Sequence, residues 1–210
     1  MASDKGLFIQ KKPSSSFTKV TGLPFPNINI VQSDDYGLVL LGIFGYGIIK
    51  IDAHSYKIIS RHDNKLWAKT KSILIQNDDI IWLATENNGI VKLNTCTGEF
   101  SVLSEDSGLS SSKIRTLMED SWGNIWIGTS GSGLIKKTNQ LFKHHNMIDN
   151  GFGGNRVYAV TQDKTDKIWM AVSQDNIGYF DGFYFRKVNI DSLKIGVKIK
   201  TLAVDTSGAL

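Results

Sequence analysis

Few residues of this 210-residue chain have the types and spacing that catalysis requires. His144 and His145 are adjacent, so on a strand their rings point to opposite faces and do not share one metal ion. Ser132 lies between two glycines in a predicted hairpin, whereas a nucleophile elbow needs a strand-to-helix turn. The single cysteine, Cys96, excludes a disulfide framework and a cysteine-based zinc site. We therefore expect no metal, no cofactor and no enzymatic activity in this chain.

Ligand binding is the chemistry that the remaining polar and aromatic residues suit better. Asn155 and Arg156 can offer hydrogen bonds to a polar or acidic sugar, and a cluster of aromatic rings can stack on a sugar face. Both sets have an ordinary alternative, namely a solvated loop tip for the polar pair and a packed outer hairpin for the rings. The aromatic cluster consists of Tyr179, Phe180, Phe183, Tyr184 and Phe185.

These residues stand in a chain built from repeats of about 42 residues, a period typical of solenoids and propellers. In each repeat a turn rich in Asp, Asn and Gly is followed by one bulky apolar residue, and these bulky residues are 42, 44 and 43 positions apart. We expect them to fill the interface between adjacent repeats. They are Leu40, Trp82, Trp126 and Trp169.

The turns before the bulky residues pair an aspartate with a glycine three positions later. The aspartate can accept backbone hydrogen bonds and the glycine can adopt a positive φ, so both are predicted to close a hairpin. A calcium site is not expected, because these turns lack the dense acidic oxygens that it needs. The predicted turn residues are Asp34, Gly37, Asp120, Gly123, Asp163, Asp205 and Gly208.

Each repeat is predicted to hold four short strands. In the repeat of Trp126 these are residues 113–119, 125–129, 134–137 and 141–145, and no segment keeps the apolar spacing of a helix. Four strands in about 42 residues are typical of one propeller blade. We therefore predict an all-β propeller over 1–210, with partial blades at 1–22 and 196–210 and four blades at 23–65, 66–108, 109–152 and 153–195.

In such a propeller the loops leading into the first strands lie at one end of the blades, which is where we expect a ligand to bind. The candidate ligand-binding residues there are Asn27, Lys71, Ser112, Lys113, Asn155 and Arg156.

The charge and the hydropathy argue against nucleic acid and membrane as partners of this chain. Lys and Arg number 24 against 20 Asp and Glu, which gives a net charge of +4. The basic residues are scattered instead of forming a stripe, so nucleic-acid binding is not expected. No apolar run reaches the 18 residues of a membrane span, and the N-terminus lacks the apolar stretch of a signal peptide.

The best-formed repeat, Lys113 to Thr129 followed by Gly131-Ser-Gly-Leu134, resembles the two-component regulator propeller. A second copy runs from Asn155 to Asp163 and continues with Lys167-Ile-Trp169, and Gly108-Leu-Ser110 fits the usual lead into the first strand. The resemblance extends from Gly6 to Leu210. Two departures are Leu40 in place of tryptophan and Asp79 where glycine is expected.

The resemblance implies a non-enzymatic, ligand-sensing periplasmic module of a hybrid two-component histidine kinase. The rest of the kinase chain is then a partner, and an oligosaccharide is the implied ligand. A protein-interaction or dimerisation scaffold is the alternative, and a propeller lyase or hydrolase is a third. The chain is expected to be either a closed five-bladed ring or a stretch of a larger, seven-bladed propeller. We favour the larger propeller and expect self-association when the chain is expressed alone.

Overall fold

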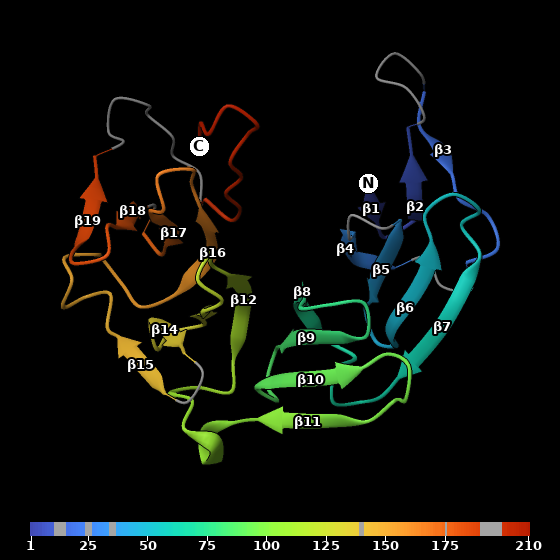
Figure 1. The fold of residues 1–210 in the computed structure, drawn as a ribbon, viewed down its shortest axis with the longest axis horizontal. Helices are drawn as coiled ribbons and strands as arrows, with labels where there is room; N and C mark the ends of the chain where they lie inside the picture. The colour runs from blue at the N-terminus through green and yellow to red at the C-terminus, as the bar shows by residue number, and fades with distance from the viewer. Residues whose placement is uncertain (11–15, 24–26, 34–36, 139–140, 175, 190–198) are drawn as a thin grey trace. The chain divides into compact units, whose positions relative to one another are not determined.

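The structure is a computed structural model that describes residues 1–10, 16–23, 27–33, 37–138, 141–174, 176–189 and 199–210. The chain divides into two compact units, Met1–Val102 and Leu103–Leu210. Within the described residues both units consist of antiparallel sheets and short turns, and the one helix is a single 3-10 turn, η1 (Glu105–Ser107). The predicted all-β class is therefore confirmed, and Figure 1 traces the strands in chain order.

The first unit holds three sheets whose strands pair in chain order. The three-stranded sheet is formed by β1 (Ala2–Ser3), β2 (Gly6–Ile9) and β3 (Thr18–Lys19). The next sheet is formed by β4 (Ile28–Ser33), β5 (Leu38–Ile43), β6 (Gly47–Asp52) and β7 (Ile58–Asp63). The third is formed by β8 (Thr70–Ile75), β9 (Ile80–Thr85), β10 (Ile90–Asn94) and β11 (Phe100–Leu103).

The second unit holds two four-stranded sheets, also paired in chain order. One is formed by β12 (Ile114–Glu119), β13 (Ile125–Thr129), β14 (Leu134–Lys137) and β15 (Phe142–His145). The other is formed by β16 (Val157–Gln162), β17 (Ile168–Val172), β18 (Asn176–Phe180) and β19 (Phe185–Val188). The four strands predicted around Trp126 match β12 to β15 within one residue at each end. Each four-stranded sheet is one blade of the predicted propeller.

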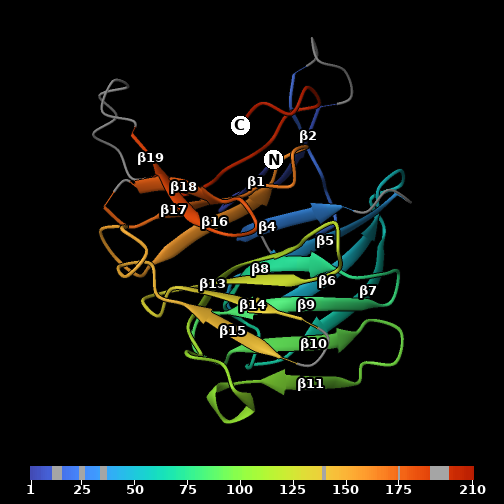
Figure 2. The same cartoon turned by 60° about the vertical axis from the view of Figure 1, so that its left-hand side comes forward.

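Blades of one unit stack face to face, because the second strand of each is apolar on both sides. All five residues of β13 are buried, which explains why its sequence does not alternate between apolar and polar residues. First strands of neighbouring blades lie side by side: β4 beside β8 (Figure 2) and β12 beside β16 (Figure 1). Burying each large aliphatic side chain in such an interface contributes about 1.5–3 kcal/mol.

The buried clusters combine side chains from two neighbouring sheets. In the second unit, Trp126 and Leu134 of one blade pack with Ile168 and Met170 of the next. In the first unit, Leu40 packs with Ile81 and other residues of the following blade. Trp126 and Leu40 thus lie in buried clusters to which two sheets contribute.

The last described segment differs from the other repeats. The sequence predicts a first strand from about residue 198, but residues 199–204 are not in a strand. A strand requires a hydrogen-bonded neighbour, and no described strand pairs with this segment. The turn that follows it does form: Asp205 donates its backbone N–H to Ala209 O at 2.8 Å, as Asp120 does to Asn124 O at 2.9 Å. The predicted turn at Asp34 lies outside the described residues.

Candidate functional site

The loop before each first strand is fixed by a backbone hydrogen bond that recurs in all four blades. The donor is the residue four positions after the bulky core residue, in the turn between the second and third strands. The acceptor is a backbone carbonyl in the loop. The same backbone bond therefore recurs from blade to blade, while the side chains at these positions differ. The donor–acceptor pairs are Phe44 with Asn27 (3.1 Å), Glu86 with Lys69 (3.1 Å), Ser130 with Lys113 (2.9 Å) and Ser173 with Arg156 (2.8 Å).

The second residue of each first strand lies in a β-bulge. The pairing register shifts by one residue there in every blade, which leaves one residue of the first strand unpaired. Bulges re-aim side chains and are frequent beside functional sites. Sequence reasoning selected one of these residues and missed the other three, although all four stand eleven positions before the bulky residue. They are Asn29, Lys71, Arg115 and Tyr158.

A polar hollow lies at the loop end of the first unit. Its volume is about 440 Å³, and its walls come from the β5–β6 turn and from the loop between β7 and β8. Asn64 is held within that loop, because its Oδ1 accepts the Leu66 backbone N–H at 2.9 Å. Carboxylate, amide, ammonium and phenol groups therefore surround one opening. The lining residues are Gly45, Tyr46, Asp63, Asn64, Lys65 and Ala68.

Lys71, a predicted binding residue, is half-buried and paired in the first unit. Glu86 lies 3.7 Å from both Lys71 and Lys69, so one carboxylate forms ion pairs with two ammonium groups. Asn27, also predicted, is exposed and has its carbonyl in the loop bond described above. The structure does not include either residue in the lining of the polar hollow.

The other predicted residues lie in the second unit, where they have different roles. The Asn155 Oδ1 accepts the backbone N–H of Met147 at 2.6 Å and of Ile148 at 3.3 Å, so this side chain braces its own loop. Ser112 donates its backbone N–H to Glu105 Oε1 at 2.9 Å. Arg156 is exposed and forms a β-bridge with Ser130, whose N–H is bound by the Lys113 carbonyl. The backbones of Lys113 and Arg156 thus both contact Ser130.

The predicted aromatic cluster separates into packed and exposed rings. Phe180 and Phe185 pack together at 4.8 Å between centroids and enclose His145, and Tyr179 packs on Trp169 at 4.9 Å. Phe183 and Tyr184 remain 85% and 68% exposed at the tip of the β18–β19 hairpin.

Asp181 holds that tip in place by accepting the backbone N–H groups of Phe183 (3.0 Å) and Tyr184 (2.7 Å) and the Arg186 Nε at 2.7 Å. The backbone bond from Tyr184, the bond from Arg186 and the backbone bond from Phe183 together lower the pKa of Asp181 to about 2.

A groove of about 400 Å³ lies at the end of the second unit that is remote from the loops before the first strands. Trp122 forms an exposed wall, while Trp126 and Phe180 contribute from the core. Two carboxylates, Asp166 and Asp181, line the same groove. Asp166 is engaged, since its Oδ1 accepts hydrogen bonds from Ser121 (3.1 Å) and Gln162 (3.0 Å).

The repeat aspartates have a second role that the sequence did not reveal. The Trp126 indole N–H donates to Asp120 Oδ2 at 2.8 Å, and the Trp169 indole N–H donates to Asp163 Oδ2 at 2.7 Å. In the blade of Trp82 the indole instead donates to Gln76 Oε1 at 3.0 Å. The turn therefore anchors the bulky core residue six positions later, and the fixed Asp-to-Trp spacing was the available signal.

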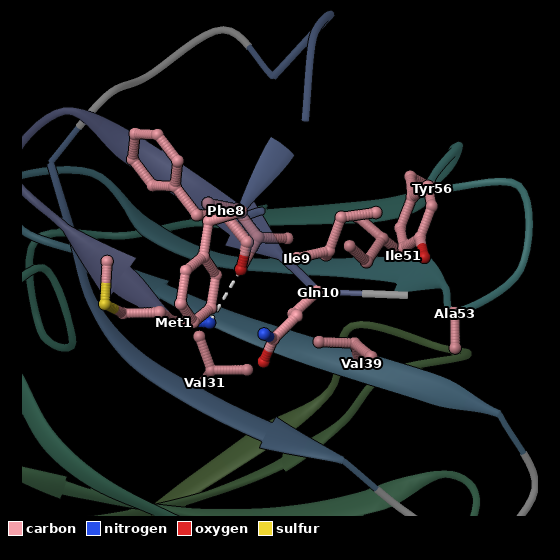
Figure 3. Close-up of a pocket in the computed structure, with 11 residues that line it drawn as sticks. Met1, Phe8, Ile9, Gln10, Val31, Val39, Ile51, Ala53 and Tyr56 are labelled. Atoms are coloured by element: carbon pink, nitrogen blue, oxygen red, sulfur yellow. Dashed lines mark hydrogen bonds between the residues drawn. The ribbon is translucent and has the colours of Figure 1, made fainter. Parts of the chain in front are cut away.

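A second hollow in the first unit is mainly apolar. It measures about 420 Å³ and lies between the β1–β3 sheet and the β4–β7 sheet (Figure 3). Phe8, Val31 and Tyr56 line it, and Gln10 contributes an amide. With so few polar groups it is poorly suited to a saccharide.

His145 and Cys96 lie in different units of the chain. His145 is half-buried among aromatic rings, and burial followed by the charges of Lys143 and Lys136 lowers its pKa to about 4. Cys96 is exposed and its thiol donates to Asp79 Oδ1 at 3.0 Å, a bond that raises the pKa of the thiol. Among the residues that the structure describes, no three His, Cys, Asp or Glu side chains are grouped as metal ligands.

Comparison with known proteins identifies the repeat. Residues 108–131 match the family profile described as two component regulator propeller, which confirms the resemblance seen in the sequence. No protein of curated function matches the chain. In the described residues no helix has the length and apolar character needed to cross a bilayer.

Solved structures share the fold at low sequence identity. The extracellular domain described as belonging to the hybrid two component system BT3049 of B. thetaiotaomicron superposes with a TM-score of 0.79 at 18% identity. The superposed region covers 94% of this chain and 28% of the BT3049 domain. The corresponding domain of BT4673 from the same organism gives 0.75 at 19%, covering 98% and 30%. Virginiamycin B lyase of Staphylococcus aureus gives 0.68 at 15%, covering 90% and 68%.

The chain therefore spans less than a third of the two sensor domains, and it matches a partial stretch of a larger propeller.

Proposed function

We propose that this chain, with its two component regulator propeller repeat at residues 108–131, is part of the extracellular sensory propeller of a hybrid two-component system and binds an oligosaccharide. The fold shared with two extracellular sensor domains supports the sensory part of the proposal. A periplasmic location and a continuing kinase chain belong to the same proposal. The chain itself acts by binding and has no catalytic role.

The polar hollow of the first unit carries the ligand part of the proposal. Saccharides are bound by several converging hydrogen-bonding groups together with an aromatic ring. Asp63, Asn64 and Lys65 supply the polar groups and Tyr46 supplies the ring. The loop that bears them is joined to the opposite turn by the Gly45 N–H to Ala68 O bond at 2.7 Å, so the hollow is formed before a ligand arrives.

Isothermal titration against a panel of neutral and acidic oligosaccharides tests the proposal. We expect one member of the panel to bind, and Asp63→Ala and Lys65→Ala to weaken its binding at least about tenfold. Lys57→Ala is the matched control, because Lys57 is exposed in the β6–β7 turn outside the hollow. A flat response to the whole panel, or equal effects of all three substitutions, would refute the assignment.

A protein-interaction scaffold is the second candidate, and the β18–β19 hairpin favours it. Phe183 and Tyr184 are exposed on a turn that Asp181 fixes, and such a rigid apolar tip suits contact with another protein. Dimerisation in light scattering combined with no saccharide binding would support this function. The fold match to a lyase motivates one more assay, in which product formation from any glycan would overturn the non-enzymatic proposal.

A further inference from the structure

Three basic residues contact Ser130 at the loop end of the second unit, two of them through their backbones and one through its side chain. The Lys113 carbonyl accepts the Ser130 N–H at 2.9 Å, and Ser130 forms a β-bridge with Arg156. The Ser130 hydroxyl accepts a hydrogen bond from Arg115 Nε at 3.2 Å. At this junction of two blades the Arg115 guanidinium therefore binds a neutral hydroxyl, and the backbones of two further basic residues, Lys113 and Arg156, flank the same serine.

The same position in the preceding blade shows how an internal carboxylate pairs with such basic residues. Glu86 occupies the place of Ser130, four residues after the bulky core residue, and its backbone makes the same bond to the loop. Its carboxylate pairs with Lys69 and Lys71, which stand at the repeat positions of Lys113 and Arg115. With serine at this point, the second unit keeps the cations and lacks the internal anion.

No protein carboxylate replaces the missing one among the described residues. The ion pairs found there join Lys69 and Lys71 to Glu86 and Arg186 to Asp181, and none involves the basic residues around Ser130. Glu105, in the loop before Lys113, accepts the Ser112 backbone N–H.

Arg115 is also pre-positioned. Its guanidinium lies over the Tyr158 ring at 5.5 Å, and one of its five N–H groups is used by Ser130. Stacking and one hydrogen bond fix the plane of the group while the other N–H donors stay available, which reduces the entropy lost on binding a planar or tetrahedral oxyanion.

We propose that the junction formed by Lys113, Arg115, Ser130 and Arg156 binds the carboxylate or sulfate group of an acidic saccharide. The anion would occupy the place that the Glu86 carboxylate takes in the preceding blade. This assignment rests on the proposed function, because it adds the charge of the ligand to a saccharide sensor. The first unit's hollow is not needed for it.

The test uses the whole chain and two substitutions at one position. Oligogalacturonate and a sulfated chondroitin disaccharide are titrated, with methyl-esterified oligogalacturonate as the neutral match and inorganic sulfate as the free anion. We expect an acidic saccharide to bind, the ester not to bind, and affinity to fall as NaCl is raised. Ser130→Glu supplies the missing carboxylate and should lower the affinity at least about tenfold, whereas Ser130→Gln, of equal size and no charge, should lower it far less.

The outcomes separate this proposal from the function on which it rests. Equal losses in the two Ser130 variants, or binding of the ester as tightly as the acid, would overturn the anion site. Binding of a neutral saccharide alone, sensitive to Asp63→Ala and not to Ser130→Glu, would leave the proposed function standing and refute this inference. Binding of inorganic sulfate with the same affinity as the saccharides would show an anion site without saccharide recognition and would also refute it. Circular-dichroism melting of both variants verifies that the fold is kept.

Discussion

Asp120 shows how one side chain can organise a whole blade. It is 4% exposed and accepts the Trp122 N–H (3.0 Å), the Asn124 N–H (2.8 Å) and the Trp126 indole N–H (2.8 Å). Replacing it with alanine leaves the buried indole donor unpaired, at a cost of about 1–3 kcal/mol, and opens the turn as well. We predict that Asp120→Ala lowers the free energy of unfolding by about 2–4 kcal/mol in urea denaturation.

The other repeat aspartates provide graded controls for that prediction. Asp163 holds a half-buried tryptophan, Trp169, so Asp163→Ala should cost less, about 1–2 kcal/mol. Asp205 closes a turn with no indole to anchor, and Asp205→Ala should cost least. Equal effects of the three substitutions would mean that the turn bonds alone matter, and that the indole bond contributes nothing measurable.

His145 should make the stability of the second unit depend on pH. Burial, helped by Lys143 and Lys136, lowers its folded-state pKa from 6.5 to about 4. Between these values the unfolded chain binds more protons than the folded one, so the free energy of unfolding falls as the pH falls from about 6.5 to 4. Because the ring is only half-buried, solvent screening reduces the expected loss to about 1–2 kcal/mol.

Urea denaturation at several pH values measures this dependence. His145→Phe keeps a ring in the aromatic cluster, removes the titrating group and should flatten the profile. His144→Gln is the matched control, since the His144 ring is exposed on the other face of β15 and its loss should leave most of the slope. A burial-lowered pKa at His62 adds a smaller slope of the same sign in the first unit, so the comparison is between variants. An unchanged slope in His145→Phe would contradict the assignment.

At the scale of the strand, a glycine sets the approach of two strands. Gly133 precedes β14 with φ at +80°, and a Cβ there would lie 2.1 Å from the carbonyl oxygen of His145 on β15. Both the backbone conformation and the space exclude a side chain. We predict that Gly133→Ala lowers the free energy of unfolding by about 2–4 kcal/mol in urea denaturation.

Gly131, in the same turn, separates the two causes. Its φ is +136°, but a Cβ there meets nothing within 4 Å. Gly131→Ala should therefore cost only the backbone strain, about 1–3 kcal/mol, and less than Gly133→Ala. If both alanine variants were destabilised equally, close packing against β15 would not be the reason for glycine at residue 133.

The strands were predictable because their pattern repeats. The period of about 42 residues, the Asp-rich turns and the bulky residue in phase predicted each four-stranded sheet, and the structure confirms this class. The repeat predicted a strand at residues 199–204, where the structure has none. A strand forms only beside a pairing neighbour, and the local sequence does not show whether that neighbour is present.

The site was harder to predict than the strands. The sequence indicated Lys113 and Arg156 by their place in the loops. It did not indicate that the Asn155 side-chain oxygen accepts hydrogen bonds from backbone N–H groups of its own loop. It also missed Arg115, since a bulge depends on strand register and leaves no residue signature of its own. Comparing the same offset across repeats would have found it.

Several large apolar side chains are exposed in the described part of the molecule. Phe183 is 85% exposed, Leu141 72% and Trp122 62%, all in the second unit. In the first unit the β1–β3 sheet has three described strands where the other sheets have four, and among the described strands β1 pairs with β2 alone. Exposed apolar patches and unpaired strand edges both promote association.

We therefore predict that the chain expressed alone self-associates, with a weight-average mass that rises with concentration in sedimentation velocity. If the exposed hairpin makes the contact, Phe183→Lys/Tyr184→Lys should shift the distribution to monomer. Thr97→Lys/Ser101→Lys adds the same charge at exposed positions of the first unit and should leave association unchanged. If both double variants still associate, the edge of β1 becomes the remaining candidate contact. A wild-type chain that stays monomeric at every concentration and melts in one cooperative step would contradict the prediction and favour a closed ring.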